Sequence, residues 1–270
     1  MKKKQSKLPS ITVTGQIFSS DMLPSLVQGN GKYQSPEDYK LLPGIRFSDE
    51  ISRSMHIGQA LYAEFKKKQT DGASLHNITN DFITKFFTLS LNYTELRKAD
   101  ENQKLVEGTL YSIPYFAAPS VPLVICPGNL KLDQTDTLFT TTKEGVTRKK
   151  SAFSLAQLYV NASKECSWAI VTNGKEIRLL HDSDSMVRPQ YVSCDIESIF
   201  EEQQYPDYLA LWYMLHASRA LIWEQWRIEG LSQGTRVRDG LRAGVTDALL
   251  HLGAGFLQTK GKGNEALRKA

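Results

Sequence analysis

The sequence has few cysteines, no long apolar run and no nucleotide-binding loop. Cys126, Cys166 and Cys194 are odd in number and widely spaced, which argues against a disulfide framework and against a C-x-x-C zinc site. No apolar run approaches the roughly 20 residues that cross a bilayer. The lysine-rich start also lacks the apolar segment of a signal peptide. We therefore expect a protein of the reducing cytoplasm with no membrane partner.

Other absences limit the chemistry. The sequence contains neither a G-x-x-x-x-G-K-[ST] phosphate loop nor the Asn-Pro-Pro-Tyr motif of adenine methylation. Its Gly253-Ala-Gly255 follows a helical pattern rather than a strand, which is the wrong context for binding S-adenosylmethionine. We therefore expect no cofactor, no metal and no methyl transfer in these 270 residues.

The composition indicates one well-packed domain with scattered positive charge. A hydrophobic content of 41% is enough to bury a core, and the net charge of +4 is mild. The basic residues gather in four clusters, at 2–4, 66–68, 143–150 and 260–269. Such clusters suit contacts with phosphates, although a solvated surface is the favoured explanation of any single one.

Apolar periodicity predicts an α/β domain built on a mixed sheet with flanking helices, followed by a helical segment. Residues 132–150 read as a long polar loop, and residues 1–45 as an arm. The expected helices cover 48–68, with Ser48 as N-cap, then 78–92, 151–162, 196–202, an amphipathic 207–220, and 236–252. The expected strands cover 108–116, 122–126, 168–171, 177–180 and 191–195.

The clearest local prediction is a β-hairpin. Trp168–Val171 and Ile177–Leu180 are apolar runs, and Thr172-Asn173-Gly174 between them is typical of a tight turn. It comes just after the expected helix that contains Gln157 and Tyr159. The sequence therefore predicts that these two strands pair antiparallel.

This order of helix, apolar strand, Thr-Asn-Gly and strand resembles the back half of a PD-(D/E)xK nuclease domain. Such domains stand at the N-terminus of large adenine-N6 DNA methyltransferases of type IIG-like restriction and DISARM-like phage-defence systems. Residues 149–161, 191–219 and 240–257 look like further segments of these proteins.

The resemblance implies a restriction-endonuclease-like, degenerate fold in three parts. These are an arm with the first helix (1–70), a nuclease-like α/β domain (71–226) and a helical connector (227–270) toward a methyltransferase domain. The resemblance also implies S-adenosylmethionine as cofactor of that further domain. Double-stranded DNA, other defence subunits or the rest of the same chain would be the partners. The 270 residues would then be a fragment or a split subunit.

A nuclease of this type needs an Asp, then Glu-x-Lys, to hold Mg²⁺ and activate water. The resemblance places the Glu and Lys near Cys126 and Gly128, and neither residue can do that work. Asp133 and Asp136, with Glu144, are weak candidates for a relocated metal site, and Gln157 is a weak candidate for a catalytic role. We therefore expect no nuclease activity, with an active endonuclease and a protein-binding scaffold as alternatives.

Four cations are the candidates for binding DNA phosphates: Arg148, Lys149, Lys150 and Arg178. His181 beside Asp182, and His216, are interpreted as structural because sequence spacing gives neither a fixed partner. The expected helix at 236–252 carries one apolar face, which we expect to pack against another domain or subunit. The alternative is that it folds back onto the sheet.

Overall fold

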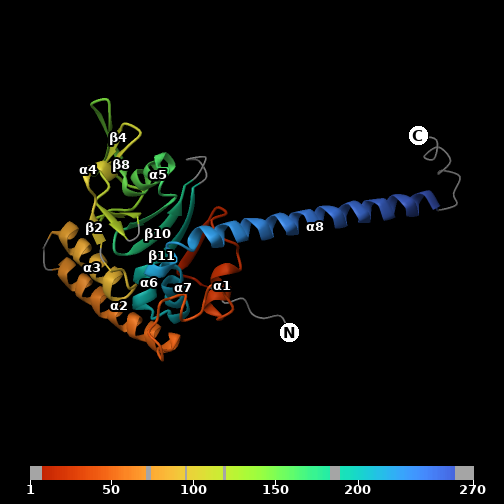
Figure 1. Ribbon diagram of the computed structural model, residues 1–270, viewed down its shortest axis with the longest axis horizontal. Coiled ribbons are helices and arrows are strands. Elements are labelled where there is room, and N and C mark those ends of the chain that lie inside the picture. The colour runs from red at the N-terminus through yellow and green to blue at the C-terminus, as the bar shows by residue number, and fades with distance from the viewer. Residues whose placement is uncertain (1–7, 71–73, 95, 118–119, 183–188, 259–270) are drawn as a thin grey trace.

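The computed structural model describes residues 8–70, 74–94, 96–117, 120–182 and 189–258. The basic clusters at 2–4 and 260–269 lie outside these ranges. The described chain forms a body of two sheets with helices, from which one long helix projects (Figure 1). None of its described helices is both long and apolar enough to cross a membrane.

A mixed seven-stranded sheet is the centre of the body, which confirms the α/β class. Its strands lie in the order β1-β11-β10-β9-β6-β5-β2, and the β6–β9 pair is parallel while the others are antiparallel. The strands are β1 (Ile11–Thr14), β2 (Leu96–Lys98), β5 (Tyr115–Ala117), β6 (Val121–Ile125), β9 (Trp168–Thr172), β10 (Glu176–His181) and β11 (Gln190–Asp195).

Two apolar cores lie on opposite faces of this sheet. Within β6, Leu123 and Ile125 belong to one core, while Val124 and the following Cys126 belong to the other. Successive side chains of a strand point to opposite faces, and a parallel pair is buried on both. This explains why β6 and β9 read as continuous apolar runs and not as alternating ones.

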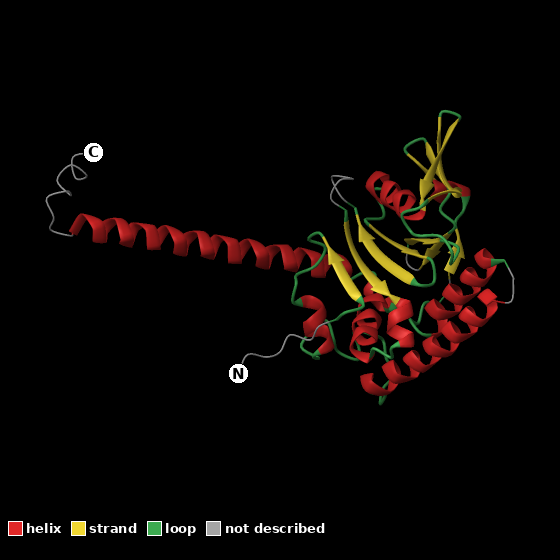
Figure 2. Cartoon of the chain, turned by 180° about the vertical axis from the view of Figure 1, so that it is seen from behind, coloured by secondary structure: helices red, strands yellow, loops and turns green. Residues whose placement is uncertain are grey.

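The larger core lies under α2 (Phe47–Thr70), α3 (Leu75–Leu89), α6 (Ile196–Glu201), α7 (Tyr205–Leu215) and α1 (Met22–Val27). The other face is covered by α5 (Ala152–Ala162), as Figure 2 shows from behind. Ser151 caps α5, since its Oγ accepts a hydrogen bond of 3.0 Å from Ser154 N. The predicted cap of α2 is wrong, because that helix begins at Phe47 and Ser48 lies in its first turn.

The predicted hairpin is confirmed. Ile177 pairs with Thr172 and His181 with Trp168 in an antiparallel ladder between β9 and β10. The turn closes between Asn173 and Glu176, whose N and O atoms lie 3.3 Å apart. Asn173 Oδ1 also accepts from Glu176 N at 2.9 Å, so the asparagine side chain fixes the turn.

The predicted loop at 132–150 is wrong. Thr135–Lys143 (β7) and Val146–Ser151 (β8) form a hairpin within a second sheet, in the order β3-β4-β7-β8. The single strand expected at 108–116 is two strands in different sheets, because β4 (Thr109–Tyr111) joins the small sheet and β5 the large one. The remaining elements of this region are α4 (Glu101–Lys104) and β3 (Leu105–Val106).

The expected arm shares the main core. β1 pairs with β11 as the edge of the large sheet, and Ile17, Leu23 and Leu26 are buried in the same core as Trp226. The larger core therefore includes residues from Ile17 to Trp226, on both sides of residue 70.

Two C-terminal helices differ from expectation. The amphipathic helix predicted at 207–220 ends at Leu215 and is buried on nearly all sides, with a short 3₁₀ turn, η1 (Ala217–Arg219), after it. The last helix, α8 (Trp223–Gln258), runs through Gly253 and Gly255 without a break. It leaves the body (Figure 1), and Leu241, Val245, Leu249 and Leu252 are each 58–66% exposed. The alternative that this face folds back onto the sheet is therefore wrong.

Candidate nucleic-acid interface

The resemblance places the nuclease residues at the end of β6, where closely packed side chains surround the chain. Cys126 is fully buried, and burial raises the pKa of its thiol to about 12. A Cβ added to Gly128 would lie 2.6 Å from Gln69 Nε2 and 3.2 Å from Phe65 Cζ. Gly128 N donates to Thr79 Oγ1 at 3.1 Å, which ties this loop to α3. A side chain at residue 128 would require the end of the Gln69 side chain to move and Phe65 to shift.

Asp133 and Arg178 are partners of each other. Arg178 Nη1 lies 2.9 Å from Asp133 Oδ1, and its Nε lies 2.6 Å from Glu176 Oε1. The guanidinium carbon also lies 5.3 Å from the ring centroid of Phe153 and 5.0 Å from that of Tyr191. The side chain of Arg178 is 11% exposed, and two carboxylate partners offset its positive charge.

The other proposed carboxylates lie at separate points of the β7–β8 hairpin. Asp136 accepts a 2.9 Å hydrogen bond from Leu138 N near the start of β7, whereas Glu144 lies in the turn after β7. Within the described part of the chain, no group of three or more His, Cys, Asp or Glu side chains is arranged to hold a metal ion.

Gln157 has a structural position under the sheet. It is 1% exposed, and its Nε2 donates to His181 O at 3.0 Å and to Asn161 Oδ1 at 2.9 Å. These bonds hold the end of β10 against α5. The hydrogen bonds described for Gln157 involve neither Asp133 nor the basic side chains of the hairpin.

The two histidines also hold elements together. His181 Nδ1 lies 2.6 Å from Asp182 Oδ1, and its Nε2 lies 3.1 Å from Glu224 Oε2, at the start of α8. Trp168 Nε1 donates to the same Glu224 oxygen at 3.2 Å. His216 is buried between Asn92 and Ser218. Both histidines therefore connect distant segments of the chain.

The predicted DNA-binding residues of 148–150 lie together on β8, at the edge of the small sheet. The side chains of Arg148 and Lys149 are exposed, and Lys150 is half-buried. In the ladder with β7, Arg148 pairs with Thr141, Lys149 with Thr140 and Lys150 with Asp136. Paired residues point to the same face of a sheet and neighbours to opposite faces. The three cations are therefore divided between two faces.

A groove lies on the face to which Lys149 belongs. Its volume is about 380 Å³, and its walls include Thr140 and Thr142 of β7, with Lys98 at the end of β2 and Lys104 of α4. Lys98 is exposed, and Lys104 lies 3.0 Å from Glu101 Oε1. Sequence reasoning did not include Lys98 or Lys104, because only the fold brings these segments beside β7.

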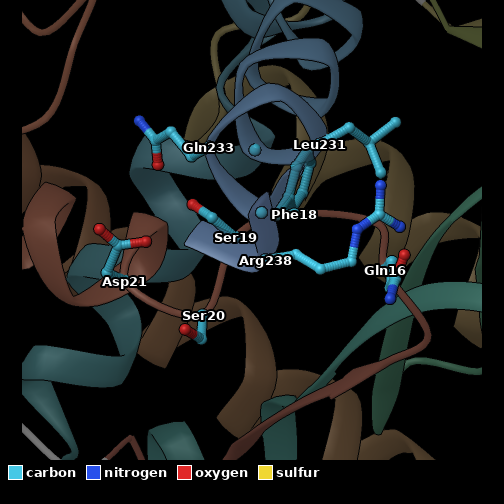
Figure 3. Close-up of a pocket in the computed structure, with 10 residues that line it drawn as sticks. Gln16, Phe18, Ser19, Ser20, Asp21, Leu231, Gln233 and Arg238 are labelled. Carbon is cyan, nitrogen blue, oxygen red and sulfur yellow. The ribbon is translucent and has the colours of Figure 1, made fainter. Parts of the chain in front are cut away.

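A second hollow lies between the segment before α1 and residues 230–238 of α8 (Figure 3). Its volume is about 530 Å³, and serine and glutamine side chains line it together with Asp21 and Arg238. A Cβ on Gly230 would lie 2.9 Å from Ser19 N, so the two segments are in direct contact there. This hollow contains one carboxylate and one guanidinium, and it lacks the gathered positive charge of the small sheet.

With this geometry established, the chain was compared with known proteins. No family model, curated protein or solved structure matches it. The interpretation of the site therefore rests on its own residues and on the sequence resemblance.

A sequence signal for the small sheet was present. Residues 137–143 are rich in threonine, and Glu144-Gly145 separates them from the alternating Val146-Thr147-Arg148. A β-branched run on both sides of a glycine turn is typical of a hairpin. The polar character of these residues led to the prediction of a loop, whereas their β-branching indicates strands.

Proposed function

We propose that this chain is the DNA-binding, nuclease-inactive N-terminal domain of an adenine-N6 methyltransferase of a bacterial restriction or phage-defence system. One observation carries the proposal: the projecting β7–β8 hairpin exposes Lys143, Arg148 and Lys149 at the edge of the body. Lysines and arginines on such a surface neutralise DNA phosphates and release counterions. The resemblance to these methyltransferases supports DNA as the partner.

The order of elements supports the same proposal. The β5–β6 hairpin is followed by β7 and β8, and then by α5 and β9, of which β9 pairs parallel to β6. This is the helix and strand order for which the resemblance was noted, with Gln157 and Tyr159 on α5 facing the sheet. In the proposed protein the methyltransferase domain with its S-adenosylmethionine would follow α8.

The proposal that nuclease activity is lost is supported by the packing at the end of β6. A buried thiol with a raised pKa is a poor ligand for Mg²⁺, and a side chain at residue 128 would have to displace the end of Gln69 and shift Phe65. Asp133 is paired with Arg178. The alternative of an active endonuclease with relocated carboxylates would need Asp133 to leave that pair.

DNA binding is tested by a salt titration with labelled duplex DNA. The wild-type protein should show a steep salt dependence. A variant with Arg148, Lys149 and Lys150 changed to Ala should flatten the slope by at least about one unit. The control variant changes Arg46, Lys67 and Lys164 to Ala, which are exposed cations elsewhere on the body. Equal slopes for the wild type and the hairpin variant would contradict the proposed interface.

Nuclease inactivity is tested on the same samples with plasmid and Mg²⁺. We expect no cleavage by the wild-type protein. Cleavage that disappears in Asp133→Ala but persists in the control Asp21→Ala would replace the proposal with the endonuclease alternative.

A second candidate function is docking of another protein, and α8 favours it. Its projecting part carries Leu241, Val245, Leu249 and Leu252, all exposed. Large side chains of this kind gain roughly 1.5–3 kcal/mol each on burial. This function is compatible with DNA binding, because the helix and the basic hairpin are separate parts of the molecule (Figure 1).

A further inference from the structure

We propose that the phosphate backbone of duplex DNA lies in the groove on one face of the small sheet, held by Lys98, Lys104 and Lys149. The proposal rests on the proposed DNA-binding function and goes further, because it assigns one face of the hairpin and two cations outside it. Arg148 and Lys150, on the other face, are not part of the contact.

Strand alternation separates the cations. Lys149 pairs with Thr140, which lines the groove, so the two side chains leave the same face about 5 Å apart at Cβ. Thr142 also lines the groove, and its hydroxyl lies 2.9 Å from that of Thr147 across the ladder. The groove face of the hairpin is therefore a surface of threonine hydroxyls with a lysine at its edge.

The other face of the hairpin is occupied near its base. Thr141, the partner of Arg148, is 8% exposed, and Phe139 is buried in the same core as α5. Lys150 stands opposite Asp136 in the ladder, next to the point where the register shifts between Asp136 and Thr140. The body therefore covers this face at the base of the hairpin, where Phe139 and Thr141 are buried, whereas the groove face is open there.

Two further elements bring cations to the groove. Lys98 comes from the end of β2 and Lys104 from α4, both segments that precede the small sheet in the chain. Lys104 forms a salt bridge with Glu101, whose side chain is 81% exposed. Glu101 is the one acidic residue among those that line the groove. Together with Lys149, the groove face carries three cations against one carboxylate.

The hairpin tips limit where the backbone can lie. Glu107 and Glu144 are in two-residue turns between β3 and β4 and between β7 and β8, and the ladder Thr109–Lys143 places these turns at the same end of the sheet. Two carboxylates at that end repel a phosphate chain. The backbone is therefore expected to cross the sheet below the tips, at the level of Thr140 and Lys149.

The lining of the groove favours the duplex backbone over exposed bases. Single strands are held by aromatic rings on which bases stack. The one aromatic residue that lines the groove, Tyr111, is 6% exposed and packs edge-to-face on Tyr159 at 5.4 Å. With no exposed ring, the groove offers charge and hydroxyls, which contact phosphates without reading sequence.

The test compares two variants that lose the same charge. Lys98→Ala/Lys149→Ala changes the groove face, and Arg148→Ala/Lys150→Ala changes the opposite face of the same hairpin. Both are titrated with salt against a labelled 20-base-pair duplex, and thermal unfolding confirms that each is folded. The groove variant should flatten the salt slope by roughly two units, and the opposite-face variant should keep the wild-type slope. Lys98→Arg/Lys149→Arg should also keep the wild-type salt slope, because both positive charges are retained.

The outcomes separate this proposal from the function on which it rests. If the wild-type protein binds duplex DNA and both double alanine variants flatten the slope equally, the groove assignment is overturned and the proposed function stands. A larger effect of Arg148→Ala/Lys150→Ala likewise overturns the assignment. If the wild-type protein shows no salt-dependent binding, the proposed function itself fails. Tighter binding of the matching single strand than of the duplex would also overturn the backbone proposal.

Discussion

Residue 128 lies just after β6, and its glycine is closely packed against neighbouring side chains. The position has Gln69 and Phe65 of α2 on one side and the Thr79 hydroxyl of α3 on another. A side chain there would have to displace at least one of these neighbours. The same packing buries Cys126 two residues earlier.

Placing a glutamate at residue 126 and a lysine at residue 128 should destabilise the fold and give no nuclease activity. We expect Gly128→Lys to lower the free energy of unfolding by about 1–3 kcal/mol through overpacking. Cys126→Glu/Gly128→Lys should not cleave plasmid with Mg²⁺. The control is Gly240→Lys, at a helical position with no atom near the added Cβ, which should be neutral or slightly stabilising in urea unfolding. A Gly128→Lys protein as stable as the wild type would show that the site is open.

His216 is a buried base whose surroundings oppose protonation. Burial, and then the nearby Arg219, lower the pKa of His216 to about 4. Its Nε2 lies 3.1 Å from Asn92 Nδ2, a donor, so this nitrogen accepts a hydrogen bond only while it carries no proton. The unfolded chain binds a proton there near pH 6.5.

Acid should therefore destabilise the protein through His216. The folded state binds fewer protons than the unfolded state between pH 6.5 and 4, so this contribution to stability is present above pH 6.5 and is lost as the pH falls. Between pH 7.5 and 5 the loss is about 2 kcal/mol, measured as the free energy of unfolding in urea. His216→Gln should reduce this pH dependence, and His251→Gln, at an exposed position, should not. An unchanged pH dependence in His216→Gln would contradict the assignment.

At the scale of elements, the small sheet is built from two hairpins with the same turn. Glu107-Gly108 and Glu144-Gly145 both have positive φ at both residues, between 47° and 76°. This is the type I′ geometry of two-residue hairpins, for which asparagine followed by glycine is the favoured pair. Glutamate in this region is strained, because its Cβ approaches the backbone.

Relieving that strain should stabilise the hairpin. We expect Glu144→Asn to raise the free energy of unfolding by up to about 1 kcal/mol, because asparagine tolerates the left-handed region better than glutamate does. The comparison variant is Glu165→Asn, an exposed position without positive φ, which should change stability by less than about 0.5 kcal/mol. Equal effects of the two changes would argue against a strained turn.

At the scale of the whole molecule, α8 has two parts with different environments. Its first turns belong to the core, since Trp223 is fully buried and Trp226 packs edge-to-face on Phe18 at 6.1 Å. Its apolar positions from Leu241 to Leu252 are exposed. A helix that is anchored at one end and exposes apolar side chains at the other is suited to carry a contact with a neighbour.

Removal of the projecting part should leave the body intact. We expect a chain ending at Gly234 to retain the free energy of unfolding of the full chain within about 0.5 kcal/mol, because the exposed apolar residues lie beyond that point. Trp226→Ala, within the anchored part, should lose about 3–5 kcal/mol. If the shortened chain unfolds at much lower urea than the full chain, the projecting helix contributes to the body.

Elements with strong local signals were predicted well, and those that depend on neighbours were not. The β9–β10 hairpin follows from apolar runs around Asn173, and α5 follows from Ser151 and the helical spacing after it. The β7–β8 hairpin was missed because its threonines and lysines resemble a loop in polarity. In the structure these polar strands are held by pairing with β4 and by Phe139, which reaches the core. Their placement depends on residues far away in the chain.

The sequence by itself determined the α/β class, the central hairpin and the clustering of cations at 143–150, because propensity, turn chemistry and charge are local properties. Only the tertiary structure decided that Arg178 is neutralised by Asp133 and Glu176, that Gln157 is buried, and that Lys149 pairs with Thr140 of a groove lined by Lys98 and Lys104. The reason is that strand alternation and pairing choose the face and the neighbours of each side chain, and these come from segments that are distant in the sequence.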